Sequence, residues 1–449
     1  MPTLEWIGKS KVINHHQEVP FRVLERKYSF DESGQHNEDN GSENMIIRGD
    51  NLEALKALLP RYEGRIKCIY IDPPYNTGNE GWVYNDNVND PKIKKWLGEV
   101  VGKEGEDLTR HDKWLCMMYP RLKLLQKLLA DDGVIFISID DTECSNLILI
   151  CNEIFGASNF VANVSWQRTY SPRNDSKGIV SEVEHLVVFS KNPGWQPNKL
   201  PRTEAMDSRY KNPDNDVAPW KSSDAFAPGA ATHQGMVYAI QHPFTGEMLY
   251  PSNGRCWRYQ QSSMLEYMQG WCNYRLENLH DEKERARVCG IDESAVRKDV
   301  LAIVLEEPLE VSAAKAQKVY NRGRWPGFYF TKGGYGGIAR KTYLENVGGR
   351  LPTNLWMYEE TGHTDEAKKE LISLFGGRSP FDTPKPTRLL DFVLKVAGTS
   401  ETLMLDSFAG SGTTAHAVLN ANKADNGNRH FILIEMMDYA DSCLLYTSD

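Results

Sequence analysis

A carboxylate, two prolines and an aromatic ring come directly after one apolar run in this sequence. Residues 68–71 are Cys-Ile-Tyr-Ile, and Asp72, Pro73, Pro74 and Tyr75 follow them. The apolar run predicts a buried strand. Each proline fixes φ and removes a backbone donor, but it keeps its carbonyl. The segment therefore predicts a rigid turn that is rich in hydrogen-bond acceptors and carries a flat ring.

Such a turn suits the exocyclic amine of a nucleobase, which has two N–H donors and a lone pair delocalised into the ring. Hydrogen bonds from the amine to the Asp72 carboxylate and to a proline carbonyl would localise the lone pair on nitrogen. The nitrogen could then attack an electrophilic methyl group held in line, and such positioning supplies about 7–11 kcal/mol. Tyr75 would stack on the base, and the base would have to leave its duplex.

A second candidate site lies far along the chain, in residues 402–419, TLMLDSFAGSGTTAHAVL. The pattern predicts a strand that ends at Asp406, a glycine turn through Gly410 and Gly412, and then a helix. Glycines allow a sharp turn and a close approach of a ligand to the backbone. Glu435 ends the next apolar run, 23 residues after Gly412, and an acid at that distance can bind ribose hydroxyls. The turn fits the dinucleotide fingerprint loosely, and S-adenosylmethionine, which has a ribose and an adenine but no pyrophosphate, is the other candidate ligand.

Strands and helices alternate on both sides of these motifs. Residues 45–48, 64–72, 134–140, 402–406 and 430–435 read as strands, and 51–59, 111–132, 143–156, 365–375, 386–397 and 412–422 read as helices. This order predicts an α/β fold with a mostly parallel sheet and helices on both faces. Strands of such a sheet present their carboxyl ends at one edge, so Asp72 and Asp406 are expected to be neighbours.

The alternation is interrupted between residues 159 and 350. This stretch mixes aromatic residues, glycine, proline and asparagine with short apolar runs, and we expect it to be an inserted domain. It holds 25 Lys and Arg against 21 Asp and Glu, a net charge of +4, whereas the rest of the chain carries −13. The insert is thus the part most compatible with phosphate. The expected segments are an N-terminal extension 1–44, a first catalytic segment 45–158, the insert 159–350, a second segment 351–442 and an atypical end 443–449.

The composition favours an ordinary water-soluble globular protein. Hydrophobic residues make up 40% of the 449 residues, charged residues 25%, and no apolar run is long enough to span a bilayer. The eight cysteines are scattered without a C-x-x-C pair, which argues against a structural zinc site and against a disulfide framework. The start of the chain has no signal-peptide pattern. We therefore expect a cytoplasmic protein without a bound metal.

The combination of Asp72-Pro73-Pro74-Tyr75 with the segment 408–412, FAGSG, resembles the amino-group DNA methyltransferases. The order, with the acidic motif first, the insert next and the glycine motif last, is similar to their β group. The segments IIRGDNLEALKALLP, HDKWLCMMYPRLKLL, VIFISIDD, TGHTDEAKKEL and KPTRLLDFVLKVAG are similar to the modification subunits of type III restriction–modification systems. The similarity extends from about residue 45 to residue 440. It implies the Rossmann-like methyltransferase fold with an inserted target-recognition domain.

The resemblance implies site-specific methylation of adenine N6 in DNA, with S-adenosylmethionine as the cofactor. Asp72, Pro73 and Tyr75 would hold the flipped adenine of double-stranded DNA, and Pro74 completes this motif. The residues expected to bind the cofactor are Asp406, Phe408, Gly410, Gly412, Thr413, Glu435 for the ribose, Lys385, Asp50 and Asn51. The loop after Tyr75, with Trp82 and Tyr84, could fold over the base.

The same resemblance implies a homodimer that joins a separate, ATP-dependent restriction subunit. This sequence lacks the G-x-x-x-x-G-K-[ST] loop, so ATP hydrolysis is not expected of it. After residues 431–441 the family continues with a further helix and strand, whereas SCLLYTSD carries no such pattern, and we expect a truncated or artefactual end.

Three other functions compete with DNA methylation. A dinucleotide-dependent oxidoreductase would explain the glycine turn but gives the Asp72 motif no role. A non-catalytic DNA-recognition subunit could keep the same fold as a scaffold. A methyltransferase that acts on another amine or amide, in protein or RNA, is a further alternative, and the family analogy disfavours a protein amide because Asp72 stands where an asparagine would be expected.

Overall fold

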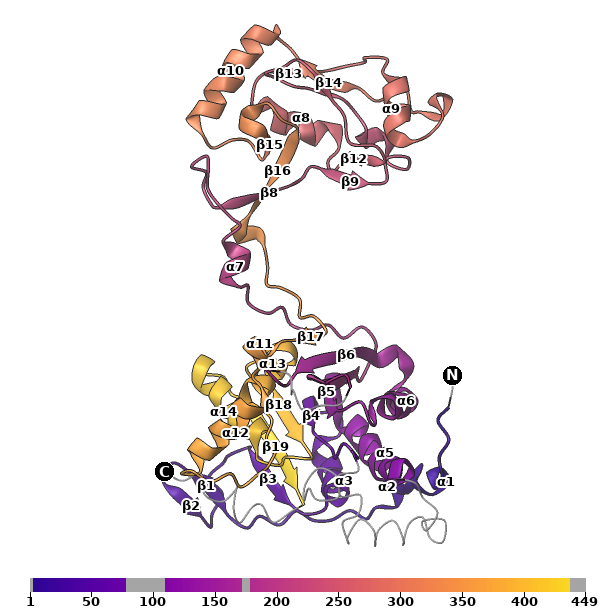
Figure 1. Cartoon of the computed structure of the whole chain (residues 1–449), viewed down its shortest axis with the longest axis vertical. Helices are drawn as coiled ribbons and strands as arrows, with labels where there is room; N and C mark the ends of the chain where they lie inside the picture. Colours follow the sequence, from indigo (N-terminus) through magenta and orange to yellow (C-terminus); the bar gives the residue numbers. More distant parts are fainter. Residues whose placement is uncertain (1–2, 78–109, 172–177, 437–449) are drawn as a thin grey trace. The chain divides into compact units, whose positions relative to one another are not determined.

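The chain forms two compact units, of which the second interrupts the first in sequence. In this computed structural model, residues 3–77, 110–171 and 178–436 are described. Unit 1 combines Met1–Leu200 with Leu351–Asp449, and unit 2 is Pro201–Arg350. Figure 1 shows that the first and last parts of the chain together build unit 1. Unit 1 is thus assembled from two sequence segments, between which unit 2 lies in the sequence.

An eight-stranded sheet forms the centre of unit 1, with the order β17-β6-β7-β5-β4-β18-β19-β3. Its strands are β3 (Met45–Arg48), β4 (Ile66–Ile71), β5 (Leu129–Ile139), β6 (Phe160–Gln167), β7 (Val183–Ser190), β17 (Leu355–Trp356), β18 (Leu403–Asp406) and β19 (His430–Glu435).

All neighbouring strands of this sheet are parallel except where β7 pairs antiparallel with β5 and β6. The predicted α/β class with a mostly parallel sheet is confirmed. One predicted boundary was wrong: β5 begins at Leu129, five residues before the expected strand start, because the chain passes directly from the helix into the sheet.

Helices cover both faces of the sheet. The larger helices of unit 1 are α3 (Asn51–Tyr62), α5 (Arg110–Leu128), α6 (Cys144–Phe155), α12 (Thr364–Leu374), α13 (Thr387–Ala397) and α14 (Thr413–Asp425), and the short α11 spans Tyr358–Thr361. Strand residues alternate between two cores: Ile69 and Ile71 pack with α3, α5 and α6, whereas Cys68 and Tyr70 pack with α13 and α14. Burial on both faces explains why β4 is apolar throughout.

The N-terminal extension contributes to the core of unit 1. Its elements are α1 (Lys9–Val12), α2 (His15–Glu18) and the hairpin β1 (Ser29–Asp31) and β2 (Gly34–His36). Val12 and Val19 belong to the core that contains α3 and α5, and α1 and α2 both contact α5. The extension thus includes a short antiparallel hairpin.

Unit 2 is built from three small sheets and four helices in the described residues. The sheets have the orders β11-β10-β14-β13, β12-β9 and β15-β16-β8. The strands are β8 (Trp220–Asp224), β9 (Phe226–Pro228), β10 (Ile240–Gln241), β11 (Met248–Leu249), β12 (Arg255–Trp257), β13 (Tyr274–Glu277), β14 (Ala302–Leu305), β15 (Phe328–Phe330) and β16 (Ile338–Tyr343). The helices are α7 (Glu204–Asp207), α8 (Gln261–Gln269), α9 (Glu282–Cys289) and α10 (Leu309–Arg322).

The inserted unit begins later than the sequence suggested. The predicted insert started at residue 159, but the compact unit starts at Pro201. The difference consists of β6 and β7, which pair with each other and, through β7, with β5 of the central sheet. The run 185–190, expected to belong to the insert, is therefore part of unit 1.

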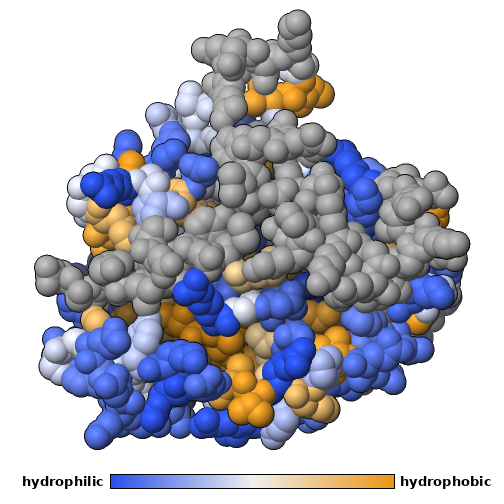
Figure 2. Space-filling view, turned by 90° about the horizontal axis from the view of Figure 1, so that it is seen from below, coloured by the Kyte–Doolittle hydropathy of each residue, from blue (hydrophilic) through white to orange (hydrophobic). Residues whose placement is uncertain are grey.

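No helix among the described residues is long and apolar enough to cross a membrane. On the face shown in Figure 2, hydrophilic residues surround smaller hydrophobic patches. The cysteines of the described residues are all buried and free of disulfides; Cys443 lies outside those residues.

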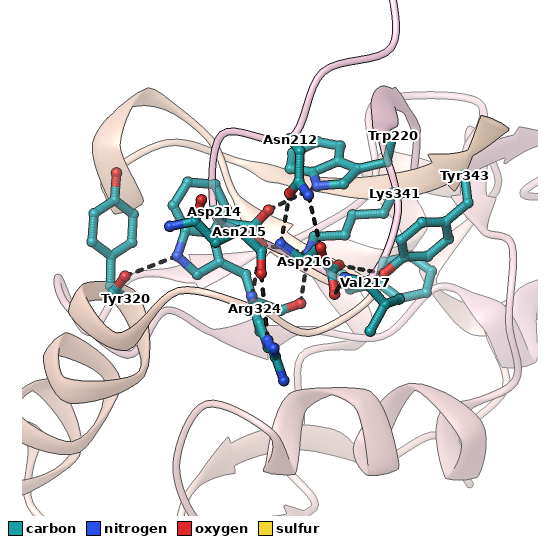
Figure 3. A network of polar contacts seen from close by, with 12 residues as sticks. Asn212, Asp214, Asn215, Asp216, Val217, Trp220, Tyr320, Arg324, Lys341 and Tyr343 are labelled. Carbon is teal, nitrogen blue, oxygen red and sulfur yellow. Dashed lines mark hydrogen bonds and ion pairs between the residues drawn. The ribbon is translucent and has the colours of Figure 1, made fainter.

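A buried ionic network holds two distant segments of unit 2 together (Figure 3). The side chain of Lys341 on β16 is fully buried, and its ammonium contacts the Asp214 carboxylate at 2.5 Å and the carboxylate of Asp216. Asp214 also accepts hydrogen bonds from the Trp220 indole at 2.8 Å and from the Trp325 backbone at 2.7 Å. Because Lys341 is shared by both carboxylates, the network fixes the loop before β8 against β16.

We predict that Lys341→Met destabilises unit 2 by about 3–5 kcal/mol, because two buried carboxylates lose their shared cation. Chemical denaturation followed by tryptophan fluorescence measures this change. Lys283→Met is the matched control, since Lys283 is exposed on α9 of the same unit, and we expect it to change the free energy by less than about 0.5 kcal/mol. Equal stability of the two variants would contradict the structural role of the network.

Candidate active site

The two sequence motifs meet at one edge of the central sheet. Strands β4 and β18 are parallel neighbours, with Leu405 opposite Ile69. Asp406 is the last residue of β18 and Asp72 directly follows β4, so both carboxylates lie at the carboxyl ends of adjacent strands. The expected proximity of Asp72 and Asp406 is confirmed, although 334 positions separate them in the sequence. This edge is where α/β sheets bind ligands.

Both carboxylate oxygens of Asp72 accept hydrogen bonds from other side chains of the protein. Oδ1 accepts a hydrogen bond from the Tyr75 hydroxyl at 2.8 Å, and Oδ2 accepts one from the Lys385 ammonium at 2.7 Å. Burial raises the pKa of Asp72, while the nearby Lys385 ammonium opposes that effect and Glu184 adds to it. The carboxylate expected to bind an amine is therefore already bound to two donors of its own chain.

The turn after Asp72 is fixed by helix α5 and by a buried acid. The Trp114 indole donates to the Pro74 carbonyl at 2.6 Å. Asn76 adopts a positive φ of 60°, and its amide donates to the buried Glu143 carboxylate at 2.5 Å. The Pro74 carbonyl is thus already engaged by a donor of the protein.

Tyr75 lies deeper than the sequence suggested. Tyr75 is only 6% exposed. Its hydroxyl lies within hydrogen-bond distance of Asp72 and, at 3.0 Å, of the Glu184 carboxylate. The Lys385 ammonium lies 5.1 Å from the ring centroid. Burial raises the pKa of Tyr75 well above its usual value, so the hydroxyl remains a donor. Stacking on a base, as expected for Tyr75, would require the ring to become exposed.

Lys385 connects the two motifs. Its carbonyl accepts a hydrogen bond from the Thr413 hydroxyl at 3.2 Å, at the start of α14, while its ammonium reaches Asp72. The ammonium also lies 3.6 Å from the Glu184 carboxylate. The sequence placed Lys385 on the cofactor side; the structure places its backbone there and its charge beside Asp72.

Glu184 is the principal site residue that the sequence analysis missed. It lies on β7, is buried, and its Oε1 contacts the Arg168 guanidinium at 2.9 Å. Burial would raise the pKa of Glu184, but Lys385 and Arg168 outweigh burial and lower it. A signal did exist: Glu184 shares its face of the strand with Leu186 and Val188, which are core residues, and an acid at such a position is unusual.

The glycine loop is held by two buried carboxylates. Asp406 accepts from the Phe408 backbone at 3.0 Å and from the Thr414 hydroxyl at 2.6 Å. Glu435 accepts from the Gly410 backbone at 2.8 Å. Gly410 and Gly412 have φ values of 51° and 78°, which other residues adopt at a cost. The structure thus groups Asp406, Phe408, Gly410, Gly412, Thr413 and Glu435 around one loop; that they bind the cofactor stays a prediction.

Asp50 and Asn51 lie at the start of α3, and Asn51 supports this loop. Asp50 caps α3 by accepting from the Leu52 backbone at 2.9 Å. The Asn51 amide donates to the Ser407 carbonyl at 3.1 Å, and the buried Arg121 guanidinium donates to the Asn51 carbonyl oxygen at 2.5 Å. Arg121 therefore fixes the amide that fixes the loop, a role that the sequence did not indicate.

The residues present fit a nucleoside cofactor with an amino-acid tail. The edge offers the acidic acceptors Asp406 and Glu435 for hydroxyl and ammonium donors, and the N-terminus of α14 for a carboxylate. The buried Ser407 hydroxyl has no hydrogen-bond partner among the described residues. In the same residues, no group of three or more His, Cys, Asp or Glu side chains could hold a metal ion. Trp82, Tyr84 and the segment 437–449 lie outside the described residues.

This chain is similar to known proteins over most of its length. The DNA methylase family N6_N4_Mtase matches residues 66–442. The type III restriction–modification enzyme StyLTI Mod subunit of Salmonella typhimurium is 33% identical over 408 residues, which cover 88% of this chain and 53% of the relative. The EcoPI Mod subunit of Escherichia phage P1 is 30% identical over 466 residues, covering 96% and 63%.

The type II methyltransferase M.KpnI of Klebsiella pneumoniae is 28% identical over 404 residues, which cover 88% of this chain and 81% of the relative. By contrast, the chain spans less than two thirds of the length of the type III relatives that it matches.

Because Asp406 is buried, the stability of the protein should depend on its titration. Burial raises the pKa of Asp406 to about 7, against the hydrogen bonds from Thr414 and Phe408. Between about pH 4 and 7 the folded protein would hold this proton and the unfolded chain would not, so stability should fall as pH rises, by about 1.4 kcal/mol per pH unit. Above about pH 7 this contribution should be constant.

Asp406→Asn removes the titration and keeps the shape of the side chain. The wild type should lose stability relative to this variant as pH rises to about 7, with a constant difference beyond that. Urea unfolding of both proteins at several pH values measures it, and parallel pH profiles would contradict the assignment to Asp406.

Proposed function

Because the chain belongs to the N6_N4_Mtase family of DNA methylases, we propose that it transfers a methyl group from S-adenosylmethionine to N6 of adenine in DNA. The observation that carries this proposal is the adjacency of Asp72 and the glycine loop at one sheet edge. The reaction needs a hydrogen-bond acceptor for the adenine amine and, within reach of it, a pocket for the nucleoside cofactor.

The side chains at the edge have distinct roles in this mechanism. Asp72 and the Pro73 carbonyl accept hydrogen bonds from the two N–H groups of the adenine amine. These bonds hold the nitrogen in place and favour localisation of its lone pair on that atom. When bound, S-adenosylmethionine supplies an electrophilic methyl group. Glu435 would accept from its ribose hydroxyls, and Asp406, Phe408 and the backbone of the glycine loop would hold it. The base must leave the duplex first, at a cost of a few kcal/mol.

We further propose that the chain is a modification subunit of a type III restriction–modification system. The StyLTI and EcoPI relatives are named as such subunits, and the sequence resemblance extends to the same class. In this proposal unit 2 recognises the target, the protein acts as a homodimer, and a separate ATP-dependent restriction subunit joins it. Its location is the cytoplasm, where the DNA is.

A second candidate is a methyltransferase that works without a restriction subunit. The M.KpnI relative, a type II enzyme, is matched over 81% of its own length, more than the type III relatives. Affinity purification of this chain from its native cells distinguishes the two: recovery of an ATP-hydrolysing partner supports the type III assignment, and a chain recovered alone supports the type II assignment. The dinucleotide-dependent oxidoreductase has no supporting relative among the proteins named above.

We predict that Asp72→Ala abolishes methylation but keeps S-adenosylmethionine binding. Removal of the amine acceptor should lower kcat by at least about 10³-fold, while the cofactor residues remain in place. Sequencing of modified bases in DNA from cells that express each protein identifies both the base and its sequence context. Asp141→Ala is the matched control, because Asp141 is an exposed acid just beyond the next strand, β5.

Full methylation by Asp72→Ala would contradict the mechanism. Cofactor binding without any methylated base in the wild type would instead favour the non-catalytic DNA-recognition subunit.

We also predict that Glu435→Gln weakens S-adenosylmethionine binding by about 10- to 100-fold, because a charged acceptor for the ribose becomes a neutral one. Calorimetric titration of the cofactor measures the change, and the melting temperature checks that the Gly410 contact has not been lost with it. An unchanged dissociation constant would remove Glu435 from the cofactor site.

A further inference from the structure

The acceptor that the proposed reaction requires is occupied by the protein itself. Asp72 Oδ2 binds the Lys385 ammonium at 2.7 Å and Oδ1 binds the Tyr75 hydroxyl at 2.8 Å. A charge-assisted bond to an ammonium is stronger than one to a neutral amine. The adenine amine therefore competes with Lys385 for the same oxygen and would lose unless Lys385 has another acceptor.

A cation at this position has a second effect. The adenine nitrogen becomes more positive as it attacks a methyl group, and an ammonium in contact with Asp72 would repel that charge in a site with little water. Productive binding of the base thus requires Lys385 to move away from Asp72 while it keeps a partner for its charge.

Glu184 is the acceptor within reach. Its Oε2 lies 3.6 Å from the Lys385 nitrogen and 3.0 Å from the Tyr75 hydroxyl, the same two donors that bind Asp72. Arg168 fixes the other oxygen, Oε1, at 2.9 Å. A shift of the ammonium by less than about 1 Å completes a hydrogen bond of ordinary length to Glu184. The side chain of Glu184 is 8% exposed, so water offers little competition.

The charges of the cluster also allow this exchange. Asp72 and Glu184 carry the two negative charges, and Lys385 and Arg168 carry the two positive charges. Lys385 and Arg168 lower the pKa of Glu184 despite its burial, so it is an ionised acceptor at neutral pH. Transfer of Lys385 to Glu184 keeps the ammonium paired with a carboxylate, and the N–H group of the bound adenine amine takes its place on Asp72.

We propose that Glu184 is a positioning residue, which takes up the Lys385 ammonium and the Tyr75 hydroxyl when the adenine amine binds Asp72. The inference rests on the proposed function and adds to it a residue that neither sequence motif contains.

Glu184→Gln tests this role. The amide oxygen is a weaker partner for the ammonium, so Lys385 stays on Asp72, and kcat/KM for DNA should fall at least about tenfold. The KM and dissociation constant for S-adenosylmethionine should stay within about twofold. Glu182→Gln, which removes the same charge two residues earlier in the chain, is the matched control and should stay near the wild-type rate.

A double-mutant cycle with Lys385→Met separates positioning from a general structural effect. Without the ammonium nothing competes for Asp72 Oδ2, so Glu184→Gln should cost less than about twofold in the Lys385→Met background. The same four proteins are compared by their equilibrium affinity for DNA with adenine or with purine at the target position. Purine lacks the amine, so the ratio of the two affinities measures the preference for adenine. Glu184→Gln should lower the preference for adenine in the wild-type background and not in the Lys385→Met background.

The outcomes separate this inference from the function on which it rests. An equal cost of Glu184→Gln in both backgrounds, a wild-type rate for Glu184→Gln, or a loss of cofactor binding or stability in that variant would contradict the positioning role alone. A wild type that methylates no DNA would contradict the proposed function, and the positioning role with it.

Discussion

The parallel pairing of β4 with β18 is the interaction on which the site depends. Cys68 and Ile69 pair with Met404 and Leu405, and all four side chains are fully buried. The pairing joins the two sequence segments of unit 1 and aligns the ends of the two strands. A shift of one residue along β18 would exchange the two faces of that strand and move every group that follows it. The burial of these side chains therefore fixes the distance between the acidic turn and the glycine loop.

The fold was predictable to the extent that apolar periodicity repeats locally. The helices and strands around both motifs follow that periodicity. The parallel sheet that they predict also implies that Asp72 lies near the glycine loop. The start of unit 2 was not predictable in this way. β6 and β7 read as part of an irregular stretch, because their membership of the sheet is decided by antiparallel pairing with β5. That information lies in a contact between distant residues and not in the segment itself.

The same distinction applies to the site. Its backbone motifs are readable from glycine and proline, whose conformational effects are local. The partners of Lys385, and the presence of Glu184 beside Asp72, follow from the register of β7 and from the position of the loop before α13. Arg121 likewise acts on the glycine loop only through Asn51. Side chains that position other side chains leave only weak signals in a single sequence.

The two units use buried charge differently. In unit 2, Lys341 binds both carboxylates of its cluster and the Trp325 carbonyl at once, so the ammonium has a single stable position. In unit 1, Lys385 is bonded to one carboxylate and lies just beyond bonding distance of another. The first arrangement suits a fixed structure, and the second suits a group that changes partner. The antiparallel pairing of Trp220 with Tyr343 also places the two chain segments near the ends of unit 2 side by side. A unit attached through adjacent segments can be exchanged by recombination for another of different size and sequence while the host sheet stays intact.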